Sequence, residues 1–218
     1  MPQQSLSEGC QVFISQPVGS VGGEITVPGD KSISHRALLL SSIADGTSTI
    51  RGFLRSEDCL ATLAALQAMS VDVVAEGSDL KILGVGIEGL QSPPGPLNLG
   101  NSGTATRLLA GVLAAQPFDS VLTGDASLRK RPMERVAIPL RLMGAVIETR
   151  GGGEAPLKIK GGRLLTGIDY TLPIASAQLK SALLLAALWA EGQTTIRSPR
   201  RTSDHMGRMM SVMGEKKD

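Results

Sequence analysis

The chain repeats itself, and the repeat limits the architectures open to it. Met69-Ser70-Val71 recurs 74 residues later as Met143-Gly144-Ala145, and Leu80-Lys81-Ile82 recurs 77 residues later as Leu157-Lys158-Ile159. Repeats of this length indicate one supersecondary unit used several times, with neighbouring units burying a shared core. Short β-branched runs between glycines predict strands, and apolar residues at helical spacing predict helices.

Each unit is predicted to follow the order βαβαββ. Unit one, about 25–84, has strands at 25–27, 47–50, 71–75 and 80–83 and helices at 34–44 and 57–69. Unit two, about 97–161, has strands at 97–99, 120–123, 145–149 and 157–160 and helices at 102–114 and 132–143. Pro132 is expected at the first position of its helix, where its missing N–H costs nothing.

A third unit, about 167–214, is predicted to be incomplete. Strands at 170–172 and 194–196 and helices at 176–190 and 204–213 lead to Met213-Gly214, which matches Met143-Gly144. Two closing strands should follow, but the sequence ends at Asp218. We therefore expect a truncated or split protein. A natural fold of two and a half units is the alternative, disfavoured because it leaves sheet edges unpaired.

Composition excludes several classes of protein. Of 218 residues, 42% are hydrophobic, which allows a sizeable core and argues against disorder. A net charge of +2 and an aromatic content of 2% disfavour a general polyanion surface or base-stacking platforms. Cys10 and Cys59 predict two reduced thiols, and His35 and His205 lack the spacing of a zinc site.

The sequence contains no segment that predicts a signal peptide or a membrane span. The polar stretch 1–11 contains no apolar signal sequence. The longest dense apolar run, 182–190, falls well short of the ~20 residues that a membrane span needs. We expect a soluble, cytoplasmic protein.

The residues best suited to chemistry lie where the first helix of each unit starts. These segments are Pro28-Gly29-Asp30-Lys31-Ser32-Ile33-Ser34-His35-Arg36, Gly100-Asn101-Ser102-Gly103-Thr104-Ala105-Thr106-Arg107 and Ala175-Ser176-Ala177-Gln178. Helix starts offer free N–H donors and a partial positive charge, and Lys31 and Arg36 add full charges. Units packed around a pseudo-threefold axis could bring these starts together as a pocket for a small anion.

Simpler interpretations exist for these motifs. Serine and asparagine at helix starts are ordinary caps, although three at matched positions favour a site. The segment 29–32 is not a nucleotide-binding P-loop, because Asp30 separates Gly29 from Lys31. The loop 125–132, which contains Arg129, Lys130 and Arg131, is either a solvated basic loop or a second anion contact.

Together these motifs resemble the EPSP synthases, the 3-phosphoshikimate 1-carboxyvinyltransferases. The resemblance rests on segments 28–36 and 100–107, on Arg131-Pro132 and on Ser176-Ala177-Gln178, and it runs from about 21 to 214. It implies an α/β (α+β) fold, an inverse α/β barrel domain of three βαβαββ units around a pseudo-threefold axis. Residues 21–218 would be the N-terminal one of two such domains. Residues 1–20, with a strand at 12–14, would pair with the second domain.

The resemblance also implies a reaction. The family transfers the enolpyruvyl group of phosphoenolpyruvate to the 5-hydroxyl of shikimate 3-phosphate and releases phosphate, on the route to chorismate and aromatic amino acids. It needs no metal or organic cofactor, and glyphosate occupies the phosphoenolpyruvate site. Gly103 is the small residue of sensitive members, so we expect a sensitive-type pocket.

The implied site residues fall into two groups. Those for shikimate 3-phosphate are Lys31, Ser32, Arg36, Ser176, Ala177, Gln178 and Ser203. Those for phosphoenolpyruvate are Lys31, Asn101, Gly103, Arg131 and Gln178. Lys31 is also the candidate catalytic residue, because the principal acid/base carboxylates belong to the second domain. Asp125 and Glu134 are expected to pair with the basic loop.

One position departs from the family pattern. Ser203 stands where many members carry an arginine, and Arg200 or Arg201 is the candidate replacement. A complementary C-terminal half is a possible partner, and we expect the isolated chain to be inactive. The alternatives are a non-catalytic fragment that binds shikimate 3-phosphate, a purely structural fragment, and a UDP-N-acetylglucosamine enolpyruvyl transferase. The last lacks support because no cysteine lies in the loop 125–130. An RNA 3′-phosphate cyclase is disfavoured because its catalytic histidine context is missing.

Overall fold

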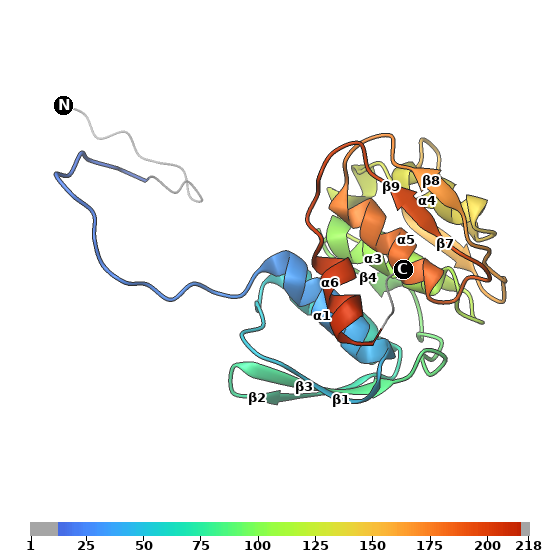
Figure 1. Ribbon diagram of the computed structural model, residues 1–218, viewed down its shortest axis with the longest axis horizontal. Coiled ribbons are helices and arrows are strands. Elements are labelled where there is room, and N and C mark those ends of the chain that lie inside the picture. Colours follow the sequence, from blue (N-terminus) through green and yellow to red (C-terminus); the bar gives the residue numbers. More distant parts are fainter. Residues whose placement is uncertain (1–12, 215–218) are drawn as a thin grey trace.

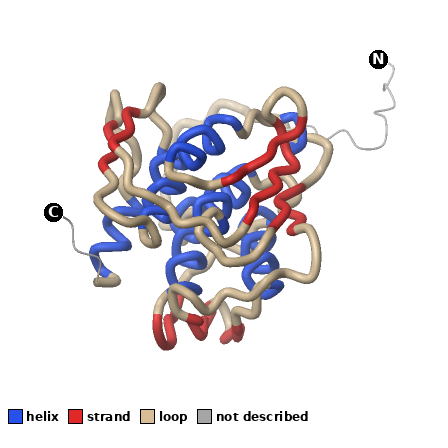
Figure 2. The backbone as a smooth tube through the Cα atoms, turned by 90° about the vertical axis from the view of Figure 1, so that its right-hand side faces the viewer, coloured by secondary structure: helices blue, strands red, loops and turns tan. Residues whose placement is uncertain are grey.

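The computed structural model describes residues 13–214 and places six helices at the centre of the molecule. The helices are α1 (Lys31–Ile43), α2 (Glu57–Ala68), α3 (Gly103–Leu113), α4 (Glu134–Leu142), α5 (Ala177–Ala187) and α6 (His205–Val212). A short 3₁₀ helix, η1 (Leu128–Lys130), precedes α4. The strands lie in separate groups around this helical interior (Figure 2).

The strands form three sheets within the described residues, one for each unit. The first has the order β1-β3-β2, with β1 (Asp45–Ile50), β2 (Asp72–Glu76) and β3 (Asp79–Val85). The second has the order β4-β5-β7-β6, with β4 (Leu97–Asn98), β5 (Ser120–Thr123), β6 (Val146–Arg150) and β7 (Glu154–Lys160). The third contains only β8 (Asp169–Thr171) and β9 (Thr195–Arg197), which are parallel.

The register confirms that units one and two repeat. Leu80 of β3 pairs with Ile50 of β1, and Leu157 of β7 pairs with Leu122 of β5, each in an antiparallel ladder. The matched motifs of the sequence thus occupy equivalent sheet positions. Unit two is complete, whereas unit three has no closing pair of strands among the described residues.

Two predictions about unit boundaries are wrong. The predicted strand 25–27 is not a strand: Ile25 and Val27 are 83% and 70% exposed and lie on an extended arm that leads away from the body (Figure 1). A strand needs a hydrogen-bonded neighbour, and no strand within residues 13–214 pairs with this segment. Pro132 is also not the first helical residue, because α4 starts at Glu134 after the N-cap Met133.

The expected strand at 12–14 lies partly outside the described residues. Phe13 and Ile14 are exposed and have no regular structure. The expectations for 1–11 fall outside the described part, as do those for 215–218. None of the helices within residues 13–214 has the length and apolar character needed to cross a bilayer.

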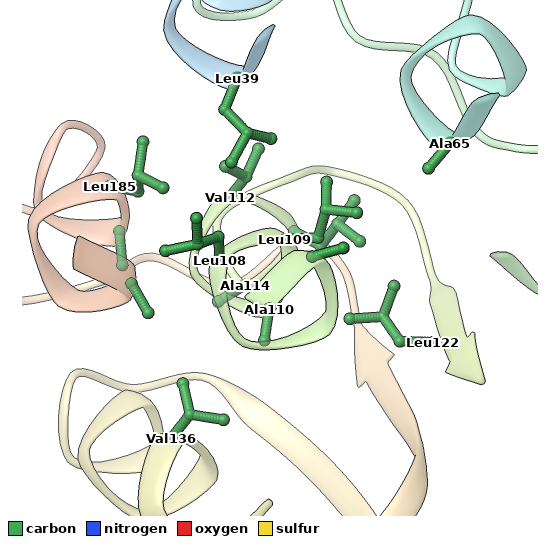
Figure 3. Packing of buried hydrophobic residues seen from close by; sticks show 14 of the residues in the cluster. Leu39, Ala65, Leu108, Leu109, Ala110, Val112, Ala114, Leu122, Val136 and Leu185 are labelled. Carbon is green, nitrogen blue, oxygen red and sulfur yellow. The ribbon is translucent and has the colours of Figure 1, made fainter. Parts of the chain in front are cut away.

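The core is centred on α3. Leu108, Leu109 and Val112 are fully buried; Val112 lies beside Leu39 of α1, and Leu108 faces Leu185 of α5 (Figure 3). The crossing of α3 and α5 is so close that a Cβ at Gly111 would overlap the carbonyl oxygen of Ala182. A glycine in mid-helix is otherwise unfavourable, so its presence here reflects this close approach.

The α1–α2 contact buries a histidine. His35 is fully buried, and its Nδ1 lies 2.8 Å from Thr62 Oγ1. Its Nε2 is buried without a hydrogen-bond partner among the described atoms. Burial lowers the pKa of His35 to about 4, with smaller and opposing effects from Asp58 (raising it) and from Lys31 and Arg36 (lowering it).

We predict that Gly111→Ala destabilises the chain by about 2–3 kcal/mol. Intrinsic helix propensity alone would make the alanine variant more stable by ~1 kcal/mol. A loss of unfolding free energy would therefore come from the steric clash and not from propensity. Urea unfolding gives the measurement. Gly95→Ala is the matched control, because nothing lies within 4 Å of a Cβ there. Equal or greater stability of Gly111→Ala would contradict the close helix crossing.

We predict that His35 makes stability fall as pH falls from about 6.5 toward 4. The folded-state pKa lies below the unfolded value, so the unfolded chain binds a proton more readily in this window. The contribution of His35 to the free energy of unfolding is fully present above about pH 6.5 and is lost by about pH 4, a total of roughly 3 kcal/mol. Unfolding free energies of wild type and His35→Gln across this range test it. Parallel pH profiles of the two proteins would contradict the prediction.

Candidate active site

In each of the three units, the first helix begins with an N-cap residue whose side chain is hydrogen-bonded to the helix backbone. Each cap side chain accepts a hydrogen bond from the backbone N–H three residues later: Asp30 from Ile33 at 2.8 Å, Ser102 from Ala105 at 3.2 Å and Ser176 from Leu179 at 3.2 Å. The capping interpretation is therefore confirmed for these side chains. The remaining question is whether the neighbouring residues also form a site.

Arg36 joins the start of α1 to α5. It is 2% exposed, and its Nε and Nη2 donate to Ser181 Oγ at 3.1 and 2.8 Å. Nη1 donates to the Ser32 carbonyl at 2.8 Å, and Nη2 to the Ala177 carbonyl at 3.4 Å. Of the five N–H groups of a guanidinium, only one on Nη1 has no partner within residues 13–214. Burial lowers the pKa of Arg36, and Asp30 partly offsets this.

Gln178 joins the start of α5 to α3. Its Oε1 accepts a hydrogen bond from Arg107 Nη1 at 2.7 Å, and its Nε2 donates to Thr104 Oγ1 at 2.9 Å. Arg107 also donates to the carbonyl of Pro132 at 3.3 Å, just before α4. These bonds connect α5 to α3, and α3 to the segment before α4, and they fix the direction of the Gln178 amide.

Arg131 approaches the start of α3 from the end of η1. It donates to Asn101 Oδ1, and Asn101 Nδ2 donates to Asp125 Oδ2 at 3.0 Å. A Cβ at Gly103 would lie 3.1 Å from Nη1 of both Arg107 and Arg131. Glycine at this position therefore lets two guanidinium groups lie against the helix start.

Lys31 is held at the first position of α1 by α2. Its Nζ lies 2.9 Å from Asp58 Oδ2, and its side chain is about half exposed. The next residue of α2, Cys59, directs its Sγ to the Lys31 carbonyl at 3.8 Å. The first turn of α2 thus fixes both the backbone and the charge of Lys31, while leaving part of the ammonium group open.

Four cations form what we call the basic cluster: Lys31, Arg36, Arg107 and Arg131. Of these, only Lys31 has a carboxylate ion pair within the described residues. Burial lowers the pKa of Arg107, and the nearby charges of Arg131 and Arg135 lower it further. Unneutralised cations beside the positive ends of helix dipoles attract an anion, with carboxylates and phosphates the best matches for guanidinium groups.

The fold places most, but not all, of the predicted site residues in one region. Lys31, Ser32, Arg36, Asn101, Gly103, Arg131, Ser176, Ala177 and Gln178 lie on the helix starts and the η1 loop just described. Ser203 and the candidates Arg200 and Arg201 are exposed on the segment before α6. No hydrogen bond connects that segment to the basic cluster in the described part of the chain.

Sequence reasoning missed several partners and misjudged two. Asp58, Ser181 and Thr104 hold predicted site residues, but each is 27 to 145 residues away in sequence from its partner. Nothing local in the sequence pointed to these pairings. Asp125 accepts the N–H of Leu128 at 2.7 Å instead of pairing with a cation, and Glu134 pairs with Arg141 at 2.7 Å. The expected pairing with the basic loop is therefore wrong for Glu134, whereas Asp125 contacts the backbone of that loop and none of its cations among the described residues.

Comparison with known proteins identifies the family. The family model described as EPSP synthase (3-phosphoshikimate 1-carboxyvinyltransferase) matches residues 15–216. A 3-phosphoshikimate 1-carboxyvinyltransferase of Methylococcus capsulatus is 57% identical over 93% of this chain and 47% of its own length. One from Xanthomonas campestris pv. campestris is 51% identical over 96% of this chain and 48% of its length.

A solved structure supports the same assignment. The EPSP synthase from Acinetobacter baumannii superposes with a TM-score of 0.87 at 55% identity, covering 89% of this chain and 44% of that one. The chain thus spans about half the length of the relatives it matches, with the basic cluster inside the matched region. The match over residues 15–216 shows that this chain belongs to the EPSP synthase family.

Proposed function

We propose that this chain supplies the anion-binding half of an active site that joins shikimate 3-phosphate to phosphoenolpyruvate. The observation that carries the proposal is the basic cluster, in which three guanidinium groups and Lys31 lie at the starts of α1 and α3 and the end of η1, two of them bonded to α5. Both substrates are polyanions, and the relatives bear the name of this transferase. The whole reaction then needs the further length that those relatives have.

The proposed reaction is an addition followed by an elimination. The 5-hydroxyl oxygen of shikimate 3-phosphate bonds to C2 of phosphoenolpyruvate, and C3 gains a proton to become a methyl group. The C2–O bond to phosphate then breaks while the methyl group returns one proton. The products are the enolpyruvyl ether and inorganic phosphate, so no electrons are gained or lost and no redox cofactor is called for.

The proposed roles divide the site along its helices. We assign shikimate 3-phosphate to the α1 and α5 starts through Lys31, Ser32, Arg36, Ser176, Ala177 and Gln178, with Ser203 as a further contact. We assign phosphoenolpyruvate to Lys31, Asn101, Gly103, Arg131 and Gln178. The free N–H on Arg36 Nη1 allows it one ligand contact while its other bonds hold α5.

General acid–base chemistry needs a group within hydrogen-bond reach of the reacting atoms. The carboxylates closest in the chain to the basic cluster already have partners. Asp58 pairs with Lys31, Asp30 caps α1, and Asp125 accepts from Asn101 and from Leu128 N–H. We therefore propose that the principal proton-transfer groups lie outside this chain.

A second candidate function is binding without turnover. The same observation favours it: the basic cluster is assembled inside this chain, whereas Asp30, Asp58 and Asp125, the described carboxylates that contact its helix starts, are already hydrogen-bonded. An isolated chain that binds shikimate 3-phosphate but releases no phosphate would fit this alternative. Turnover distinguishes the two functions, and ligand affinity does not.

We predict that phosphate is released only when this chain is mixed with the remaining portion of a full-length relative, such as that of Methylococcus capsulatus. Both substrates are supplied, and free phosphate is measured over time. Lys31→Ala should lower the rate at least ~100-fold, as expected for the loss of one charged transition-state contact. Lys158→Ala, which removes an exposed lysine of β7, is the matched control and should leave the rate unchanged.

The possible results separate the proposals clearly. Release by this chain alone would mean that one of its own carboxylates transfers the proton. If the mixture binds shikimate 3-phosphate but releases no phosphate, the non-catalytic alternative is favoured. Full activity of Lys31→Ala would remove Lys31 from the mechanism.

We predict that glyphosate inhibits the mixture and that Gly103→Ala weakens both glyphosate and phosphoenolpyruvate. The new Cβ would lie 3.1 Å from Arg107 and Arg131, so both guanidinium groups would have to shift. A cost of about 1–3 kcal/mol corresponds to roughly 5- to 150-fold weaker binding. The KM for phosphoenolpyruvate and the inhibition constant measure it. Gly151→Ala, with nothing within 4 Å of its Cβ, is the control. Tolerance of the unsubstituted mixture to glyphosate would refute the sensitive-type pocket.

A further inference from the structure

Ser181 of α5 is a buried serine whose hydroxyl group makes three hydrogen bonds. It is 1% exposed, and its Oγ accepts the Nε–H and an Nη2–H of Arg36 at 3.1 and 2.8 Å. The same hydroxyl donates to the carbonyl oxygen of Ala177, one turn earlier in α5, at 2.7 Å. A hydroxyl group has one hydrogen and two lone pairs, so its hydrogen-bonding capacity is fully used. The direction of the Ser181 hydroxyl is therefore fixed, with both lone pairs facing Arg36.

These bonds decide which part of the Arg36 guanidinium can meet a ligand. Nε and Nη2 form a forked edge that can hold a carboxylate or a phosphate through two parallel hydrogen bonds. Ser181 occupies this edge, and the carbonyls of Ser32 and Ala177 each accept one further N–H. Only one N–H of Nη1 then has no partner within residues 13–214. Arg36 thus offers a ligand a single contact, in a direction that Ser181 sets.

We propose that Ser181 is a positioning residue for shikimate 3-phosphate and acts through Arg36. The inference rests on the proposed function, in which Arg36 contacts this substrate. Ser181 has no hydrogen-bonding capacity left for a ligand of its own, so its effect on binding passes through the guanidinium. Phosphoenolpyruvate is assigned to residues that do not include Arg36, so the effect of Ser181 is confined to one of the two substrates.

The physical basis is that Arg36 is buried as well as charged. It is 2% exposed, so water does not readily replace an acceptor that is removed. Without the Ser181 hydroxyl, two buried N–H donors lose their acceptor, and the guanidinium has to turn to recover partners. A guanidinium held in advance loses less conformational freedom when the ligand arrives. Ser181 therefore supports affinity by fixing Arg36 before binding.

The test uses the mixture of this chain with the remaining portion of the Methylococcus capsulatus relative. Ser181→Ala should raise the KM for shikimate 3-phosphate roughly 5- to 30-fold, as expected for buried donors left without an acceptor. The KM for phosphoenolpyruvate and kcat should each change by less than about twofold, which is the pattern of a lost ground-state contact. Calorimetric titration of the mixture with shikimate 3-phosphate alone gives the dissociation constant for variants with slow turnover.

Ser42→Ala is the matched control. Ser42 is a fully buried serine of α1, and its Oγ donates to the Leu38 carbonyl at 2.7 Å, the same one-turn bond that Ser181 makes to Ala177. It makes no hydrogen bond to an arginine within residues 13–214. The control therefore removes the same helix bond without disturbing a guanidinium, and it should leave both KM values unchanged.

A double-mutant cycle with Arg36→Lys separates positioning from a general loss of structure. Lysine keeps the positive charge but has no forked edge for Ser181 to hold. In the Arg36→Lys background, Ser181→Ala should therefore weaken shikimate 3-phosphate by less than about twofold, because the two residues act as one unit. Ser181→Thr keeps the hydroxyl group and should retain an affinity close to that of the unsubstituted chain.

The outcomes distinguish this inference from the proposed function. If the unsubstituted mixture does not bind shikimate 3-phosphate, the proposed function fails and this inference fails with it. If the unsubstituted mixture binds the substrate and Ser181→Ala binds it equally well, this inference alone is wrong. An equal loss of affinity with and without Arg36→Lys would also overturn it, as would an equal rise in the KM for phosphoenolpyruvate, because Ser181 would then act on the fold and not through Arg36.

Discussion

The contact of α5 with both α1 and α3 is the constraint from which the rest of the molecule follows. Gly111 lets α3 approach the backbone of α5 at Ala182, so the two helices are in backbone contact at this point. Arg36 then fixes α1 to the same helix through Ser181. Because these helices belong to three different units, this single contact sets how the repeats are arranged around their common centre.

The same contact creates the chemistry. A buried guanidinium is costly unless its N–H groups have acceptors, and Arg36 obtains them from Ser181 and from carbonyls on two helices. Gln178 and Arg107 repeat this solution between α5 and α3. None of these acceptors carries a negative charge, so the hydrogen bonds are satisfied while the positive charge is not neutralised. A site built in this way holds cations rigidly and retains their attraction for an anion.

Features of the fold and the site could be predicted from the sequence where they depend on residues close together in the chain, and not where they depend on residues far apart. The helices, their caps and the repeated ladders follow from local patterns, and the sequence identified nine of the residues now found on the helix starts and the η1 loop. The strand at 25–27 failed because β propensity does not supply a neighbouring strand. The Lys31–Asp58 and Arg36–Ser181 pairs were beyond reach, since they join residues 27 and 145 positions apart. The acid in the first turn of α2 had a sufficient local explanation in the helix dipole, which concealed its role beside Lys31.

Under the proposed function, the division of labour between this chain and the rest of a family-length protein has a physical basis. Carboxylates placed inside the basic cluster would pair with its cations and compete with the anionic substrates. Keeping proton-transfer groups on a separate body allows the cations to stay available until both bodies meet. Closure would then remove water and strengthen every charge interaction at the moment the acid–base groups arrive. The engaged state of Asp30, Asp58 and Asp125 agrees with this arrangement, because each of these three carboxylates already has a partner within the protein.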